Sequence, residues 1–121
     1  MFNCLAVGLG GFLGSVCRYL ISLIPLGKGT PFPLHTLAIN LIGAIVIGLL
    51  ASAALRGSPL SPRMLLFFKT GVCGGFTTFS TFALETGDLL HGGHPWLASI
   101  YAVLSLVLGV AAVFAGQSLA R

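Results

Sequence analysis

Charged side chains are scarce in this sequence. Of its 121 residues, six are Lys or Arg and two are acidic, which is 7% of the chain, whereas an ordinary soluble domain carries about a quarter. The composition therefore excludes a soluble globular domain. With only Glu85 and Asp88, the chain lacks a ring of carboxylates of the kind that selects cations. No Ser–His–Asp set or phosphate-binding loop occurs at a useful spacing, so we expect no enzyme, and no nucleic-acid partner is expected either.

Metal-ligand patterns are lacking as well. The cysteines Cys4, Cys17 and Cys73 lie in apolar stretches without the spacing of metal ligands, which is typical of small packing residues. His91 and His94 are separated by two glycines, and no third ligand lies nearby in the sequence. We therefore expect no zinc site.

Long apolar stretches fill most of the chain, since 56% of its residues are hydrophobic. A bilayer core of ~30 Å requires about 20 apolar helical residues. The sequence therefore predicts an all-α, multi-pass membrane protein with a single membrane-embedded domain, residues 1–121, and no removable signal peptide. Gly10 and Gly14 form a small-residue face for close helix packing. The four expected transmembrane helices cover residues 2–24, 34–55, 64–90 and 96–119.

The third stretch is predicted to be a broken helix. Its run 71–82, GVCGGFTTFSTF, combines three glycines with several Thr and Ser residues. Glycine lowers helix propensity, and hydroxyl side chains compete for backbone partners. Non-helical backbone at membrane depth persists only where protein or a water-filled cavity covers it, and such breaks commonly form ion sites in transport proteins. We therefore expect a break near residues 74–80, at the functional centre.

Polar residues on these stretches each leave two interpretations open. Arg18 is either a snorkelling side chain near a helix end or a positive charge in a vestibule. Asn40 either bonds to a neighbouring helix or offers its N–H to an anion. Glu85 is either a structural hydrogen-bond anchor or a functional carboxylate. Tyr101 and Ser105, one helical turn apart, either hold helices together or form part of a polar track.

The basic residues give little preference for one orientation in the membrane. Four spans place both termini and the second loop on one side, with Arg56, Arg63 and Arg121, and leave Lys28 and Arg18 for the other side. So small a difference favours insertion in both orientations. Four helices are also few for enclosing an aqueous path, which favours an oligomer. An antiparallel homodimer satisfies both observations.

If the break lines an ion path, its side chains suit a small anion. Hydroxyls and freed backbone amides are hydrogen-bond donors, and the rings of Phe79 and Phe82 have positive edges that stabilise an anion weakly. Weak binding at several sites is what conduction requires. The alternative is that both rings only pack against lipid or protein.

The run 71–82 followed by Glu85 resembles the signature of the Fluc (CrcB) fluoride channels. The runs GGFLGSVCRY (10–19) and PLHTLAINLIGA (33–44) are similar to that family's first and second helices. The resemblance covers all four spans in order. It implies an antiparallel, dual-topology homodimer with two pores, which allows passive and fluoride-selective efflux across a prokaryotic plasma or inner membrane.

The resemblance also implies roles for individual residues. Arg18 would give the vestibule its positive charge, and Glu85 would lie close to the path. Backbone carbonyls of Gly74 and Thr77 would hold a structural sodium ion that is not transported. The implied pore residues carry hydroxyl, amide or aromatic groups, with Phe79 and Phe82 as an aromatic box; they are Asn40, Phe79, Ser80, Thr81, Phe82, Tyr101 and Ser105.

Two residues depart from the family pattern, and one rival class is close in size. His35 stands where we expect a glycine before Thr36, and Gly109 stands where we expect another hydroxyl one turn beyond Ser105. The rival is a proton-coupled exporter of the small multidrug resistance type. That chemistry needs a carboxylate in the first helix, and residues 2–24 contain none. A purely structural membrane subunit would leave the predicted break without a purpose.

Overall fold

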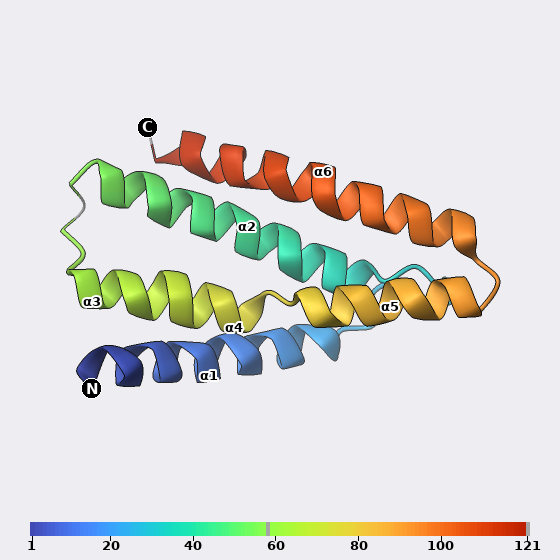
Figure 1. The fold of residues 1–121 in the computed structure, drawn as a ribbon, viewed down its shortest axis with the longest axis horizontal. Helices are drawn as coiled ribbons and strands as arrows, with labels where there is room; N and C mark the ends of the chain where they lie inside the picture. Colours follow the sequence, from blue (N-terminus) through green and yellow to red (C-terminus); the bar gives the residue numbers. More distant parts are fainter. Residues whose placement is uncertain (58, 121) are drawn as a thin grey trace.

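The computed structural model describes residues 1–57 and 59–120, and the described chain is helical apart from its turns (Figure 1). Arg121, one of the residues in the charge comparison, lies outside the described residues. The described part contains no strand, which confirms the expected all-α fold. Its elements are α1 (Phe2–Ser22), α2 (Leu34–Leu55), α3 (Pro62–Leu65), the π-helical η1 (Leu66–Cys73), α4 (Gly74–Phe76), α5 (Phe79–His91) and α6 (Pro95–Leu119).

Three of these helices are long and apolar enough to cross a membrane: α1, α2 and α6. The fourth rod in Figure 1 consists of two pieces placed end to end. The first piece consists of α3, η1 and α4, which follow one another with continuous helical backbone. The second piece is α5, which has 13 residues. Since about 20 residues are needed to span the hydrocarbon core, neither piece spans it alone. The chain is a membrane protein whose third segment is interrupted.

Two predicted helix bounds differ from those observed by two residues. The first helix ends at Ser22 rather than Ile24, because Pro25 disfavours helical backbone in the residue before it. The third segment begins at Pro62 rather than residue 64, because the Ser61 side chain caps it and proline suits a first turn. The other bounds differ from the predicted ones by at most one residue.

Close packing between helix pairs depends on glycines. The segment formed by η1 and α4 lies along α1, and α2 lies along α6 (Figure 1). A Cβ atom on Gly10 or Gly14 would clash with backbone atoms of the third segment, and one on Gly116 would clash with the carbonyl of Ile45 in α2. The small-residue face expected on the first helix is thus confirmed as a contact surface.

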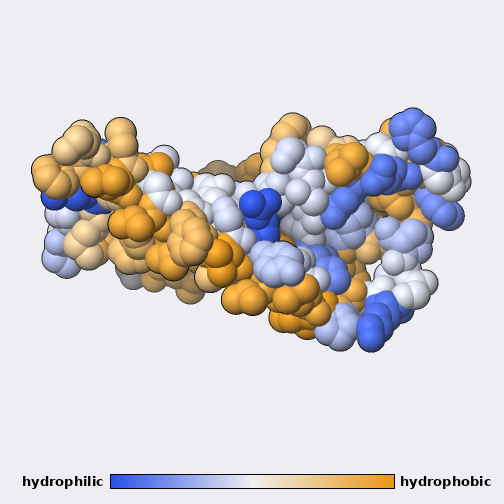
Figure 2. All heavy atoms as spheres, turned by 90° about the horizontal axis from the view of Figure 1, so that it is seen from below, coloured by the Kyte–Doolittle hydropathy of each residue, from blue (hydrophilic) through white to orange (hydrophobic). Residues whose placement is uncertain are grey.

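The interruption lies near the middle of the molecule, while the N-terminus and the end of α6 lie at the same end as the turn between α2 and α3 (Figure 1). Seen from below, the end that holds the N-terminus is largely hydrophobic at its surface, and hydrophilic side chains gather in the middle and at the opposite end (Figure 2). A small buried core joins α2, α5 and α6 at that opposite end; it contains Leu37, Leu89, Ala98 and Tyr101.

Candidate functional site

Two threonines form the break in the third segment. Thr77 and Thr78 have extended backbone, with ψ values of 157° and 118°. The Thr78 hydroxyl accepts a hydrogen bond from the N–H of Thr81 and so caps α5 (3.3 Å). The Asn40 side chain clamps the same residue, because its Oδ1 accepts from the Thr78 N–H (2.8 Å) and its Nδ2 donates to the Thr78 carbonyl (3.1 Å). One N–H of the Asn40 amide remains beyond these two bonds.

The break deprives the carbonyls that precede it of the partners that a continuous helix would give them, and those of Gly74 and Thr77 belong to the expected sodium site. In an α-helix the carbonyl of one residue accepts from the N–H four residues later. Gly74 would accept from Thr78, whose N–H bonds to Asn40, and Thr77 would accept from Thr81, whose N–H bonds to the Thr78 hydroxyl. Backbone carbonyls freed in this way coordinate Na⁺ in broken membrane helices. The chemistry of this pair of oxygens therefore fits the expected sodium ion.

A cavity of about 430 Å³, here called the inner cavity, opens beside the break. None of the residues that line it is charged. The Ser105 hydroxyl oxygen is buried and has no hydrogen-bond partner within the described residues. A buried polar atom without a partner is costly, so this hydroxyl suits a ligand that accepts a hydrogen bond. The lining that bears on function consists of Asn40, Gly74, Thr77, Thr78, Phe79, Phe82 and Ser105.

Aromatic rings form a continuous series from the inner cavity into the core. The ring centroids of Phe79 and Phe82 lie 5.6 Å apart, with 46° between the ring planes. The Phe82 ring lies 5.1 Å from that of Tyr101, which in turn meets Phe32 edge-on. Tyr101 is fully buried, whereas 78% of Phe79 is exposed in the single chain. Phe82 is thus held from behind, and Phe79 projects outward.

Glu85 joins three helices. Its Oε1 accepts from the Thr36 hydroxyl of α2, and its Oε2 accepts from the Tyr101 hydroxyl of α6, both at 2.7 Å. These two hydrogen bonds connect α5 to both α2 and α6. The geometry matches the structural-anchor interpretation of Glu85. It also directs the Tyr101 hydroxyl toward Glu85.

A second cavity, of about 370 Å³, lies on the other side of the break; we call it the Arg18 cavity. Arg18 is partly buried there, and His35 lines the same space, with its Nε2 against the Ile24 carbonyl. Thr81 and Glu85 also contribute to its wall. Thr78 lines both cavities, so the two spaces lie on either side of this residue at the break. His35, one of the two residues that depart from the family pattern, therefore lines the same cavity as the predicted vestibule charge.

The predicted residues fall into four places. Arg18, Thr81 and Glu85 line the Arg18 cavity, and six predicted residues line the inner cavity: Asn40, Gly74, Thr77, Phe79, Phe82 and Ser105. The Ser80 hydroxyl lies 3.3 Å from that of Thr78, at the exposed side of the break. Tyr101 lies behind Phe82 rather than in either lining. On α6, a Cβ at Gly109 would meet no heavy atom within 4 Å.

One residue of the site is not among those predicted from the sequence. It is Thr36, which holds Glu85 through its hydroxyl. Thr78 is among the hydroxyls of the predicted break that are expected to line an ion path, and it borders both cavities. A signal existed for Thr78, because a threonine before a helical run is a typical N-cap. None existed for Thr36, whose partner lies 49 residues later in the chain.

Comparison with known proteins identifies the family. Residues 5–117 match the family described as "CrcB-like protein, Camphor Resistance (CrcB)". The chain belongs to the CrcB family. The match extends over α1, α2 and the whole broken segment, and reaches to the last turn of α6. Both cavities therefore lie within the CrcB-like region.

Individual CrcB-family relatives are similar over nearly their full length. A protein of Chlorobaculum tepidum named "Fluoride-specific ion channel FluC" is 49% identical over 121 residues, which is 100% of this chain and 96% of the relative. Proteins with the same name from Agrobacterium fabrum and Methanopyrus kandleri are 45% and 44% identical. The alignments cover 100% and 96% of this chain, and 98% and 87% of those relatives.

Proposed function

We propose that this CrcB-family chain forms a fluoride-selective channel that lets fluoride leave the cell passively and so relieves its toxicity. One observation carries the proposal: an uncharged cavity, whose Ser105 hydroxyl has no partner among the described residues, and an arginine-bearing cavity both border Thr78 at the break of the third helix. The one carboxylate among the described lining residues, Glu85, already has a hydrogen-bond donor on each oxygen. The names of the relatives support the same function.

The proposed path begins at the Arg18 cavity and passes Thr78 into the inner cavity. The positive charge of Arg18 raises the local concentration of anions. Fluoride is small and strongly hydrated, so a path must replace its water with closely spaced donors. The Ser105 hydroxyl, the remaining N–H of Asn40 and the ring edge of Phe82 supply such groups. A larger halide fits the same narrow path poorly.

In this proposal the functional unit is an antiparallel homodimer with two pores. The exposed Phe79 and the open side of the inner cavity support this, because a second copy placed there would complete the wall. Related by a two-fold axis, it would bring its own Gly74 and Thr77 carbonyls toward those of the first. A structural sodium ion held by these oxygens supplies a positive charge that links the two copies.

The proposed location is the plasma or inner membrane of a prokaryotic cell. The apolar surfaces of α1, α2 and α6 support membrane insertion. Insertion in both orientations within one membrane is the arrangement that an antiparallel dimer requires. A reporter that has one activity on the inner side of the membrane and a different activity on the outer side, fused to a chain terminus, would test this. Both activities are expected from the same population of fusion proteins.

Fluoride efflux from liposomes tests the function. Purified protein is reconstituted into vesicles loaded with potassium fluoride or potassium chloride, and release is followed with ion-selective electrodes after valinomycin is added. Rapid fluoride release with negligible chloride release is expected. Vesicles without protein are the control for leak. No release by folded protein, together with exchange of an organic cation for protons, would instead establish the exporter.

A further inference from the structure

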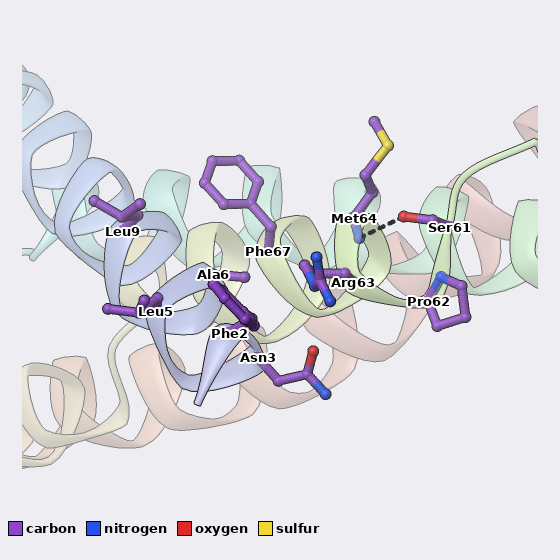
Figure 3. A pocket seen from close by; sticks show the side chains of 10 residues that line it. All are labelled: Phe2, Asn3, Leu5, Ala6, Leu9, Ser61, Pro62, Arg63, Met64 and Phe67. Carbon is purple, nitrogen blue, oxygen red and sulfur yellow. Dashed lines mark hydrogen bonds between the residues drawn. The ribbon is translucent and has the colours of Figure 1, made fainter.

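A groove far from both cavities lies between the start of α1 and the start of the third segment (Figure 3). Its volume is about 720 Å³. The first turns of α1 form one wall, with Phe2, Leu5 and Leu9, and the other wall includes Met64 and Phe67. Phe2, Leu5 and Leu9 are each more than half exposed. The groove is thus open, mostly apolar and on the outer surface of the molecule.

The groove runs from the membrane surface into the hydrocarbon layer. Because α1 has 21 residues, a length of about 31 Å, its first residue lies near one surface of the bilayer. Leu9 follows Phe2 by seven residues, so the groove descends by about 10 Å. This depth and lining match the upper part of a lipid acyl chain.

One basic side chain among the described lining residues marks the surface end of the groove. The Arg63 guanidinium lies over the Phe2 ring, 5.5 Å from its centroid. The ring covers one face of the guanidinium and orients it, while the N–H groups at its edge can bind a phosphate through two parallel hydrogen bonds. None of the residues that line the groove is acidic, and both acids of the chain lie in α5.

The geometry points to a binding site for an anionic phospholipid. The phosphate of the lipid is bound by Arg63, and one acyl chain lies along Leu5, Leu9 and Phe67. A zwitterionic lipid places a positive group beside its phosphate and gains less from an arginine without a nearby acid. The site is independent of fluoride conduction, because it shares no lining residue with either cavity.

Native mass spectrometry of the full-length protein tests this site. Detergent-solubilised protein is titrated with phosphatidylglycerol or phosphatidylcholine carrying the same acyl chains. We expect preferential retention of phosphatidylglycerol, and a loss of about fivefold in Arg63→Gln, because this variant lacks the group that binds the phosphate directly. Arg56→Gln is the matched control, since it removes the same charge from the same end of the molecule outside the groove. Its retention of the lipid is expected to stay within about twofold of the unmodified protein.

A second variant tests the contribution of the acyl-chain wall to lipid binding separately from that of the Arg63 charge. Ala6→Phe fills the groove and is expected to lower retention of both lipids. If Arg63→Gln does not fold, Phe2→Leu takes its place, because it removes the ring that orients the guanidinium. Equal retention of the two lipids by the unmodified protein would overturn the proposal, as would equal losses in the Arg63 and Arg56 variants. If a second copy of the chain occupies the groove instead, Arg63→Gln would change the mass of the oligomer and leave lipid retention unchanged. This result too would refute the lipid site.

Discussion

Replacing Asn40 by Ala should close the break in the third helix. The Asn40 side chain occupies both backbone groups of Thr78. Without it, the Thr78 N–H becomes available to the Gly74 carbonyl, which is its partner in a regular helix. Hydrogen bonds in membrane proteins contribute ~0.6 to ~1.7 kcal/mol each, so the loss of two should reduce the free energy of unfolding by about 1–3 kcal/mol.

The same substitution should reduce fluoride flux as well as stability. It removes a donor from the inner cavity, and a healed helix would move Thr78 away from its place between the two cavities. A barrier raised by ~1.4 kcal/mol slows flux about tenfold, and we expect at least this effect. Flux is measured in liposomes, and unfolding is followed by heating the detergent-solubilised protein.

Two further variants sharpen the test. Asn40→Asp keeps an acceptor for the Thr78 N–H, but its ionised carboxylate sets a second oxygen against the Thr78 carbonyl and places a charge inside the membrane, so its loss of stability should be at least that of Asn40→Ala. Asn3→Ala removes an exposed amide from α1 and should change neither quantity. Normal stability and normal flux in Asn40→Ala would refute the clamp and its part in conduction.

Four other changes have defined outcomes. Phe82→Ile should lower fluoride flux about tenfold in a protein that still folds; normal flux would remove this ring from the path. Tyr101→Phe deletes a hydroxyl that donates to Glu85 and should reduce stability by about 1–2 kcal/mol in thermal unfolding, and an unchanged melting temperature would contradict the anchor. Gly14→Ala should destabilise by about 1–3 kcal/mol through a backbone clash, whereas Gly8→Ala, with open space around it, should not. Replacing sodium by a large organic cation should lower thermal stability and weaken dimers in size-exclusion chromatography, and the proposed sodium site predicts recovery when sodium returns.

The sequence predicted the helical architecture because composition alone determines most of it. Apolar stretches of about 20 residues have few alternatives to membrane helices. The break could also be expected, because residues 71–82 oppose a continuous helix by local propensity. Its position at Thr77 and Thr78 falls inside the predicted interval 74–80. The helices and the position of the break depend on residues that are close together in the sequence, so the sequence alone predicts them.

The contacts that organise the site could not be predicted in the same way. Glu85 bonds to Thr36 and Tyr101, and Asn40 bonds to Thr78, across separations of 49, 16 and 38 residues. Such pairs depend on how the helices pack, which hydrophobic patterning does not specify when lipid covers much of the surface. The π-helical stretch η1 before the break was also not anticipated. Its wider turns change which side chains share a helix face before and after η1, and no single residue type encodes this change.

The break explains how one short segment can serve ions of both signs in the proposed channel. The last turn before it ends in carbonyl groups, and those of Gly74 and Thr77 lack helical partners, which favours a cation. The first turn of α5 presents free N–H groups. The Thr78 hydroxyl caps the N–H of Thr81, whereas the N–H groups of Phe79 and Ser80 have no partner in the helix, which favours an anion. A continuous helix would pair these groups with one another. The clamp by Asn40 on Thr78 therefore maintains both environments at once, and its loss should weaken sodium binding and fluoride conduction together.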